Sequence, residues 1–470
     1  MKSMRRTKIA VTLGPASWNE KLVRGFIREG VDAFRFNFAH ENYEVVKRVV
    51  RLIKDVGGKL HPALIGDLQG PVIRIGEIED IPVRKGDVLY LVNSEKGDRE
   101  SKLVPIPSQE AYEMIDEGDV ILLESGRIAL SAEEVSYDRI RCRALMDGII
   151  KAHKTFAIKG KEIPLPALTE KDLRDVKFGV ENGFDLISLS FTRDSEDVKR
   201  LREALYDMKG DDVGIVAKIE TRRGVENLSE ITAEADAVLV ARGDLAIYFN
   251  LEEIPLIQRR IVEVTRKRGK PTIVATQLLE SMIESPIPTR SEVVDVMRAV
   301  MDGVDALLLT TETAMGKYPL ETVIWLKRII KVAEERVERG SEEIRPENIY
   351  ELLAKGVVTL SNSLKARIVA FTEYGNTARR LAKFRPQLLI HAYTGNPRVA
   401  RQLRICWGVK PHLVSLNKKD PMILSKLSEA AVKDGILSYG DIAVFTAGMR
   451  PGTTDVVKVE RILGEGLLEK

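Results

Sequence analysis

Short apolar runs rich in β-branched residues recur along the first two thirds of the chain, and each run ends in polar or charged residues. The eight runs lie at residues 8–14, 31–37, 62–67, 184–190, 213–220, 235–244, 271–277 and 304–312. Most are separated by stretches whose apolar residues recur at helical spacing, such as 42–57 and 256–269. Runs that are apolar throughout, such as AVLV at 237–240, are typical of strands buried on both faces.

Eight buried strands that alternate with helices predict an α/β fold, built as a closed (β/α)₈ TIM barrel. An open doubly wound sheet is the structural alternative. It does not by itself explain why polar residues gather at the carboxyl ends of so many runs.

The alternation is interrupted once and later replaced by a different pattern. Between residues 72 and 159 the sequence has strand patterns and turns but no long helical stretch, which predicts a small inserted β-barrel domain. From residue 346 a second α/β pattern begins, with apolar runs such as 367–372 and 441–448. We therefore expect a discontinuous barrel at 1–71 and 160–345, a β-rich lid domain at 72–159 and a C-terminal α/β domain at 346–470.

The composition excludes several classes of protein. Lys and Arg number 73 against 70 Asp and Glu, and this balance argues against a dedicated nucleic-acid binder. The two cysteines, Cys142 and Cys406, cannot form a disulfide framework or a four-thiolate metal site, and so few cysteines fit the reducing cytoplasm. No apolar stretch approaches the roughly 20 residues of a membrane span. We expect a cytoplasmic protein with no nucleic-acid or membrane partner.

Candidate chemistry lies at the carboxyl ends of the predicted strands, where (β/α)₈ barrels place their active sites. The polar residues at these ends are Arg35, Asn37, Asp67, Ser190, Lys218, Glu220, Arg242, Asp244, Thr276, Thr310 and Glu312. Any one of them is more simply explained as a salt-bridged strand end, but chance is a poor explanation for the whole set. Glu220 and Asp244 offer the hard oxygen ligands that Mg²⁺ prefers. Lys218 and Arg35 can neutralise a transferring phosphoryl group, and Gly243 would let backbone amides approach an anion closely.

The segments that carry these residues resemble the pyruvate kinase family. AKIETRRGVENL at 217–228 is similar to the family signature, with a lysine two positions before a metal-binding glutamate. The resemblance continues in family order through RFNFAH, GDLQGPVIR, VARGDL, ATQLLESMIESPIPTRSEVVDV and DALLLTTETAMGKYPLE, over about residues 7–330. It implies Mg²⁺-dependent phosphoryl transfer from phosphoenolpyruvate to ADP, giving pyruvate and ATP as the last step of glycolysis. Mn²⁺ is the expected substitute cation.

The resemblance also implies a role for each matching position. Lys218 would contact the phosphoryl group and the enolate, and Glu220 and Asp244 would bind the metal. Thr276, with the backbone amides of Gly243 and Asp244, would bind the substrate carboxylate and help a water protonate the enolate. The other implied positions are Arg35 and Ser190 beside the phosphate, Asn37, His40, Arg74 and Lys159 on the nucleotide side, and Thr310 and Glu312 as supporting residues.

The sequence departs from the family pattern at a monovalent-cation site. Asn37 and Asp67 remain, but Ala39 and Leu68 stand where members that bind K⁺ have a serine and a threonine. Val72 stands where K⁺-dependent members have a glutamate. We therefore expect activity without K⁺.

The C-terminal domain is a candidate for effector binding. TEYGNTARR at 372–380 predicts an anion site at a helix N-terminus, and TAGMRPGTT at 446–454 resembles the family's effector loop. The hypothesis is a phosphorylated effector bound by the following residues: Thr372, Asn376, Thr377, Arg380 and Arg450. An ordinary strand–turn–helix is an equally weighted alternative.

The resemblance suggests a homotetramer. Two other functions stay open, namely a catalytically silent metabolite sensor and a metal-dependent lyase or mutase acting on pyruvate enolates. The presence of Lys218, Glu220, Asp244 and Thr276 together argues against the silent sensor.

Overall fold

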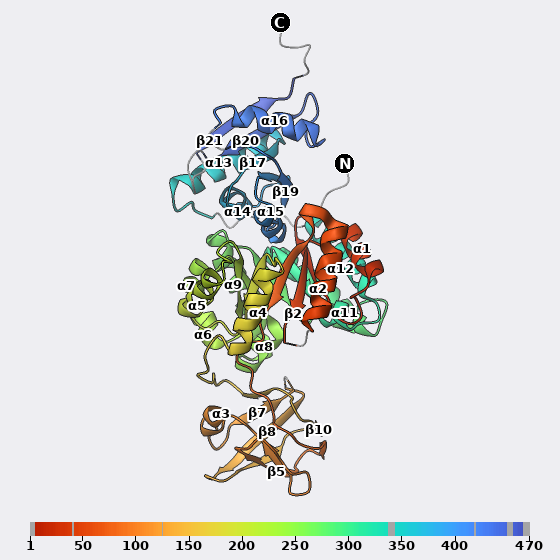
Figure 1. Cartoon of the computed structure of the whole chain (residues 1–470), viewed down its shortest axis with the longest axis vertical. Coiled ribbons are helices and arrows are strands. Elements are labelled where there is room, and N and C mark those ends of the chain that lie inside the picture. The colour runs from red at the N-terminus through yellow and green to blue at the C-terminus, as the bar shows by residue number, and fades with distance from the viewer. Residues whose placement is uncertain are drawn as a thin grey trace.

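A computed structural model of the chain describes residues 5–39, 42–124, 126–336, 344–417, 420–448 and 455–463. Three parts follow one another along the long axis of the molecule, with the barrel between the C-terminal domain and the inserted domain (Figure 1). In the described ranges, no helix is long and apolar enough to cross a membrane.

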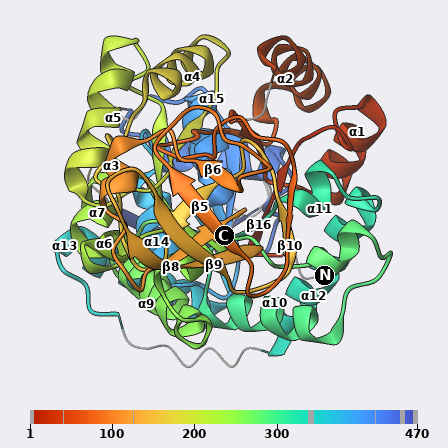
Figure 2. The same cartoon turned by 90° about the horizontal axis from the view of Figure 1, so that it is seen from below.

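The central part is a closed barrel of parallel strands, which confirms the predicted fold class. Its strands, in order around the barrel, are β1 (Lys8–Thr12), β2 (Ala33–Asn37), β3 (Ala63–Asp67), β12 (Leu186–Leu189), β13 (Gly214–Ile219), β14 (Ala237–Ala241), β15 (Thr272–Ala275) and β16 (Ala306–Leu309). Each of the eight apolar runs in the sequence forms one of them. Seen along the barrel axis, helices surround the strands on the outside (Figure 2).

The helices of the barrel begin and end where the local sequence supplies caps. Thr169 and Asp172 form a capping box at one helix start, as do Thr289 and Glu292 at another, and Gly30 ends a helix with a left-handed φ of 83°. The helices are α1 (Glu20–Glu29), α2 (Tyr43–Gly57), α4 (Glu170–Glu181), α5 (Ser195–Asp207), α6 (Arg222–Glu226), α7 (Leu228–Glu234), α8 (Arg242–Tyr248), α9 (Ile254–Lys267), α10 (Arg290–Asp302), α11 (Thr311–Ala314) and α12 (Pro319–Arg336).

Four aspartates bind the strands together at the amino-terminal end of the barrel. Each aspartate stands directly before one of four alternate strands, β2, β12, β14 and β16, and its carboxylate accepts a backbone N–H from the first or second residue of the neighbouring strand. The bonds run from Ile9 N to Asp32, Leu64 N to Asp185, Ile215 N to Asp236 and Thr272 N to Asp305, at 2.9–3.0 Å. Each aspartate also pairs with an arginine, so its charge is compensated: Arg5, Arg401, Arg202 and Arg385, respectively.

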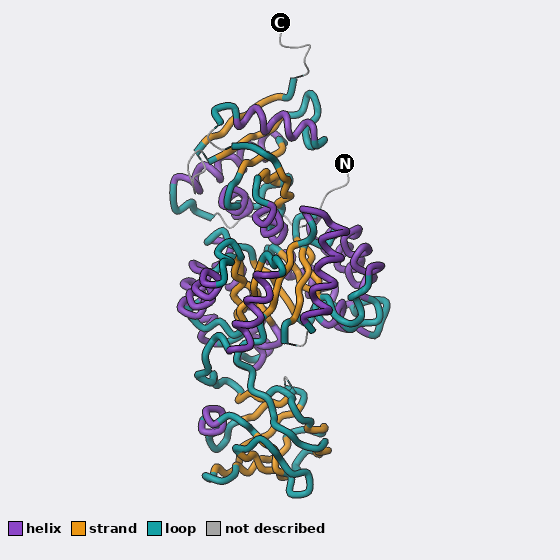
Figure 3. The backbone as a smooth tube through the Cα atoms, in the orientation of Figure 1, coloured by secondary structure: helices purple, strands orange, loops and turns teal. Residues whose placement is uncertain are grey.

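The inserted domain lies between β3 and α4 and is almost entirely strand and loop (Figure 3). Its elements are β4 (Ile81–Val83), β5 (Val88–Val92), β6 (Leu103–Pro105), α3 (Gln109–Glu113), β7 (Val120–Leu123), β8 (Ile128–Val135), β9 (Ile140–Ala144), β10 (Gly148–Ile150) and β11 (Phe156–Ile158). Six of its strands form one sheet, and β10 pairs with β4 in a separate ribbon, so strand pairing does not close the predicted small barrel in the described chain. The sheet and the ribbon nevertheless enclose one hydrophobic core.

The C-terminal domain contains a five-stranded sheet flanked by helices. Its elements are α13 (Ile349–Leu364), β17 (Arg367–Phe371), α14 (Asn376–Lys383), β18 (Ile390–Thr394), α15 (Pro397–Gln402), β19 (Val409–Leu413), α16 (Ile423–Lys433), β20 (Ile442–Ala447) and β21 (Val456–Arg461). The domain packs against the amino-terminal end of the barrel, where Lys8 Nζ donates to Val409 O at 2.6 Å. The carboxyl ends of the barrel strands therefore face the inserted domain.

Candidate active site at the barrel mouth

Lys218, near the end of β13, is the centre of the polar cluster at the barrel mouth. Its Nζ donates to Ser190 Oγ at 2.8 Å, lies 2.9 Å from Glu220 Oε1 and lies 3.5 Å from Asp67 Oδ1. Burial by itself would lower the pKa of Lys218, but the charges of Asp67 and Glu220 outweigh it and raise this pKa above its usual value. The lysine is therefore a fixed positive charge and a poor proton donor.

Asp67 joins Lys218 to a second cation. Arg35 donates to Asp67 Oδ2 through Nε at 2.8 Å and also through Nη2, while its Nη1 donates to Thr12 Oγ1 at 3.1 Å. Asp67 is only 1% exposed, and its Oδ1 has no hydrogen-bond partner in the described chain. Burial raises the pKa of Asp67, but Arg35 and Lys218 together hold it below its ordinary value. The carboxylate thus holds two cations side by side at the mouth.

Glu220 and Asp244 are two carboxylates forced close together. Glu220 Oε2 accepts from the backbone N–H of Phe191 at 2.6 Å, and Phe191 has a left-handed φ of 53°. Burial, the charge of Glu220 and a hydrogen bond with Glu220 raise the pKa of Asp244 to about 7. The charge of Lys218 lowers this pKa but does not outweigh those causes, so the two carboxylates still fit a divalent metal ion.

The donor set is small, which agrees with the chemistry of magnesium. Among the described residues, no group of three or more His, Cys, Asp or Glu side chains is placed to hold a metal ion by itself. Mg²⁺ is usually bound by one or two carboxylates, with waters and substrate oxygens completing its coordination. A pair of carboxylates at an open barrel mouth meets that requirement.

Thr276 is held in a strained position by Arg242. Thr276 and Gln277 have φ values of 68° and 54°, a region that residues other than glycine rarely adopt and β-branched residues such as Thr276 least of all. Arg242 donates to both of their carbonyl oxygens at 2.7 Å and pairs with Asp295. The sequence places Arg242 among the charges at the strand ends. In the structure it acts as a brace, because its hydrogen bonds hold the backbone of Thr276 and Gln277 in place. Thr276 Oγ1 accepts the N–H of Gly243 at 3.0 Å, so this amide is occupied by Thr276 in the structure.

Thr310 and Glu312 lie behind this strained turn. Glu312 is buried and accepts from Thr310 N at 2.7 Å, from Thr310 Oγ1 at 3.1 Å and from Leu279 N at 3.2 Å. Its carboxylate therefore ties the end of β16 to the loop after β15.

The candidate nucleotide residues are less closely grouped. Asn37 Oδ1 accepts from Ala39 N at 3.3 Å, near the barrel mouth. Arg74 donates to His153 O at 2.9 Å, and exposed Lys159 follows β11, so both lie where the inserted domain joins the barrel. No hydrogen bond or ion pair in the described chain joins either of them to Lys218. His40 lies outside the described residues.

Four of the five candidate effector residues lie on one strand–turn–helix. Thr372 follows β17, and Asn376 and Thr377 begin α14 after Gly375, whose φ is 84°. The guanidinium carbon of Arg380 lies 5.3 Å from the ring centre of Tyr350. Arg450 lies outside the described residues.

Sequence reasoning missed several residues of the site. Thr12, Asp295 and Phe191 contact Arg35, Arg242 and Glu220, respectively. Thr12 stands near the end of the first apolar run, so its position was a signal that could have been used. Asp295 lies within α10, and nothing in the local sequence relates it to Arg242.

Comparisons with known proteins agree over nearly the whole chain. Residues 4–323 match the family described as "Pyruvate kinase, barrel domain", and residues 351–460 match "Pyruvate kinase, alpha/beta domain". The pyruvate kinase of Clostridium acetobutylicum is 33% identical over 97% of this chain and 99% of its own length. That of Mycobacterium tuberculosis is 36% identical over 97% and 98%. A crystal structure of a pyruvate kinase from Cryptosporidium parvum superposes with a TM-score of 0.89 at 30% identity, covering 97% of this chain and 96% of that one.

The bracing role of Arg242 predicts an effect on stability. Its side chain is 8% exposed, and Arg242→Met removes the donor to two carbonyl oxygens, so we expect the free energy of unfolding to fall by at least about 2 kcal/mol. Arg24→Met is the control, because Arg24 is 59% exposed and its pair with Glu20 should contribute less than about 1 kcal/mol. Denaturant unfolding measures both, and equal losses in the two variants would contradict the assignment.

Proposed function

The chain belongs to the pyruvate kinase family of phosphotransferases, and on that premise we propose that it transfers a phosphoryl group from phosphoenolpyruvate to ADP. The products are pyruvate and ATP, and the reaction is the last step of glycolysis. The observation that carries the proposal is the Lys218 cluster, in which one buried ammonium is held beside Ser190 and the paired carboxylates Glu220 and Asp244. Neither the silent sensor nor the lyase or mutase is favoured by a specific observation.

Charge stabilisation is the main contribution of this site. In the transfer, the bond between phosphorus and the enolic oxygen breaks, and a bond to the terminal phosphate of ADP forms. Lys218 and Arg35 neutralise the transferring group and the enolate oxygen, and Ser190 positions the lysine. Glu220 and Asp244 would hold Mg²⁺, or Mn²⁺ in its place, which supplies further positive charge when bound.

Thr276 is proposed to help protonate the enolate carbon. Its Oγ1 accepts the N–H of Gly243, so its own O–H stays available to orient a water that gives up the proton. The backbone brace by Arg242 holds this hydroxyl in place. Because the amide of Gly243 is already donated, we assign the substrate carboxylate to the amide of Asp244, which leaves the single hydroxyl hydrogen of Thr276 for the water.

The nucleotide is proposed to bind between the barrel mouth and the inserted domain. Asn37 lies at the mouth, whereas Arg74 and Lys159 lie at the join of the two domains. Closure of the inserted domain would bring the latter pair over the mouth and exclude water that could intercept the phosphoryl group.

Two further proposals concern assembly and regulation. Exposed apolar residues at helical spacing lie on α13 (Ile349 and Leu352) and on α10 (Val294 and Met301), which supports a homotetramer with two kinds of contact. A monomeric mass in solution would contradict it.

A phosphorylated effector at Thr372, Asn376, Thr377 and Arg380 is proposed from the strand–turn–helix described above.

The proposed chemistry predicts a large effect of replacing Lys218. Lys218→Met removes the charge next to the transferring group, so we expect pyruvate formation to fall by a factor of at least about 10²–10³. Lys199→Met, on the exposed face of α5, is the control and should retain full activity. Pyruvate is measured with phosphoenolpyruvate, ADP and Mg²⁺. A wild-type protein that forms none would move the sensor to first place.

The cation remnant predicts turnover without K⁺. Asp67 is already engaged by Arg35 and Lys218, and Asn37 accepts from Ala39 N. The side chain of Leu68 has no oxygen, and its carbonyl oxygen already accepts from Ser190. The rate should therefore be the same in K⁺ as in tetramethylammonium at equal ionic strength. Strong stimulation by K⁺ alone would refute this.

The effector proposal predicts that Arg380→Ala abolishes activation or inhibition by phosphorylated metabolites while the basal rate is retained. Initial rates across a panel of sugar phosphates and nucleoside monophosphates test this. A response that is unchanged in the variant would remove Arg380 from any effector site.

A further inference from the structure

The inserted domain is joined to the barrel by two chain segments. Within a few residues of each segment, the hydrogen bonds pass from the barrel to the inserted domain or the reverse. On the outgoing segment, Gly70 N donates to Asp172 of the barrel at 3.1 Å, and Ile73 O accepts from Phe156 of the inserted domain at 2.9 Å. On the return segment, the change occurs between Gly160 and Glu162. Gly70 and Gly160 have φ values of 69° and 78°, which glycine adopts without strain. Each segment therefore has a glycine at the point where a hinge would turn.

Lys161 and Glu162 are consecutive residues whose side chains form hydrogen bonds to different domains. Lys161 Nζ donates to Met114 O at 3.0 Å and to Asp119 at 2.7 Å, both in the inserted domain. Glu162 Oε1 accepts the backbone N–H of Arg223, in α6 of the barrel, at 2.8 Å. One backbone bond crosses over, since Gly160 N donates to Ile247 O of α8 at 3.1 Å. Glu162 is thus the first residue of the return segment whose side chain is fixed to the barrel.

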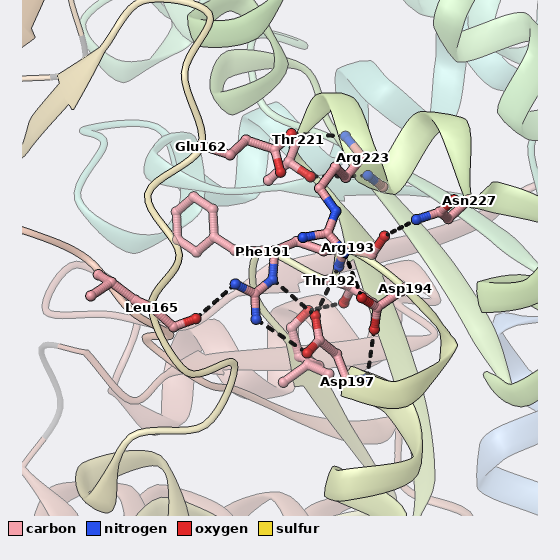
Figure 4. Close-up of polar contacts among 12 residues, drawn as sticks. Glu162, Leu165, Phe191, Thr192, Arg193, Asp194, Asp197, Thr221, Arg223 and Asn227 are labelled. Carbon is pink, nitrogen blue, oxygen red and sulfur yellow. Dashed lines mark hydrogen bonds and ion pairs between the residues drawn. The ribbon is translucent and has the colours of Figure 1, made fainter. Parts of the chain in front are cut away.

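Arg193 provides a second attachment of the same segment. Its Nη1 donates to Leu165 O at 2.7 Å, as Figure 4 shows. Asp197 fixes the same guanidinium with bonds of 3.1 Å to Nε and 3.2 Å to Nη2. Because the arginine cannot swing away from this carboxylate without losing both bonds, Leu165 is held firmly.

Arg193 and Arg223, which make these two attachments, lie on the segments after β12 and β13, and these segments also hold Glu220 in place. Phe191, two residues before Arg193, donates its N–H to Glu220. Arg223 stands three residues after Glu220, and its guanidinium pairs with Asp194 at 2.9 Å, which joins the two loops (Figure 4). This pair also gives a structural reason for a basic residue at position 223.

The junction between the inserted domain and the barrel contains a cavity and a buried carboxylate oxygen that is not hydrogen-bonded. A cavity of about 140 Å³ lies beside it, lined by residues of both segments and reaching Phe191 and Asp244. Glu162 Oε2 is buried with no hydrogen-bond partner in the described chain. A carboxylate oxygen left in this way is costly, so the residue is better explained by the position it fixes than by net stabilisation.

We propose that Glu162 and Arg193 are positioning residues. They attach the return segment of the inserted domain, which we call its pivot, to the two segments after β12 and β13 that hold Glu220 in place. Rotation of the inserted domain about the two glycines is thereby coupled to the position of the metal-binding carboxylate. The role of this coupling in turnover rests on the proposed function, but the pivot itself does not.

The pivot is tested by a distance measurement that needs no turnover. Cysteines introduced at fully exposed Tyr137 in the inserted domain and at exposed Leu256 in the barrel carry spin labels, because Cys142 and Cys406 are buried. Glu162→Ala should broaden the distance distribution clearly. Glu162→Gln should keep the wild-type width, because its amide oxygen still accepts the N–H of Arg223.

The control is Glu226→Ala, which removes an exposed carboxylate from α6, the helix that contains Arg223. This variant should also keep the wild-type width of the distance distribution. A wild-type distribution in Glu162→Ala overturns the pivot. So does a distribution in Glu162→Gln that is as broad as that in Glu162→Ala, because the hydrogen bond would then not be the cause.

The coupling is tested by the Mg²⁺ dependence of pyruvate formation. Glu162→Ala should raise the Mg²⁺ concentration for half-maximal rate by at least about threefold, whereas Glu162→Gln and Glu226→Ala should not. Equal Mg²⁺ dependence in all the variants overturns the coupling. If the wild-type protein forms no pyruvate, the proposed function fails, and the distance measurement alone still decides the pivot.

Discussion

Buried carboxylates at both ends of the barrel must be paired, and the two ends meet this requirement differently. At the amino-terminal end, four aspartates each accept a backbone N–H and an arginine, so that hydrogen bonding and charge are both satisfied. At the carboxyl end, Asp67 has an oxygen without a hydrogen bond, and the pKa of Asp244 is raised to about 7 by burial and by Glu220. The unsatisfied end is the one at which we propose that a cation and an anionic substrate bind.

The C-terminal domain is part of the charge balance of the barrel. Asp185 and Asp305 are buried, and their arginine partners, Arg401 and Arg385, come from that domain. Removing the domain would leave two uncompensated charges at strand starts, which is strongly unfavourable. The barrel and the C-terminal domain are therefore expected to behave as one structural unit, whereas the inserted domain is joined through two glycine-containing segments.

Three residues with a strained backbone lie at the same mouth. Phe191, Thr276 and Gln277 have left-handed φ values, and each is held there by a contact with a charged side chain, Glu220 or Arg242. Such strain persists only where the surroundings hold it, and here it places the N–H of Phe191 on Glu220 and the hydroxyl of Thr276 on the N–H of Gly243, next to Asp244 in the chain. The geometry of the candidate site thus depends on Phe191 and Arg242, which are not among its candidate ligands.

The sequence by itself determined the eight strands, the order of the domains and the set of residues at the carboxyl ends, because strand periodicity and barrel topology are local and repetitive signals. It also placed Lys218 two residues before Glu220, and the two side chains meet in the structure. Only the tertiary structure decided which charges neutralise one another. Asp67 proved to be the counterion of Arg35 and Lys218, Arg242 a brace for Thr276, and the inserted domain a sheet with a separate ribbon. These outcomes depend on contacts between strands and loops far apart in the chain, and local pattern contains no information about such pairings.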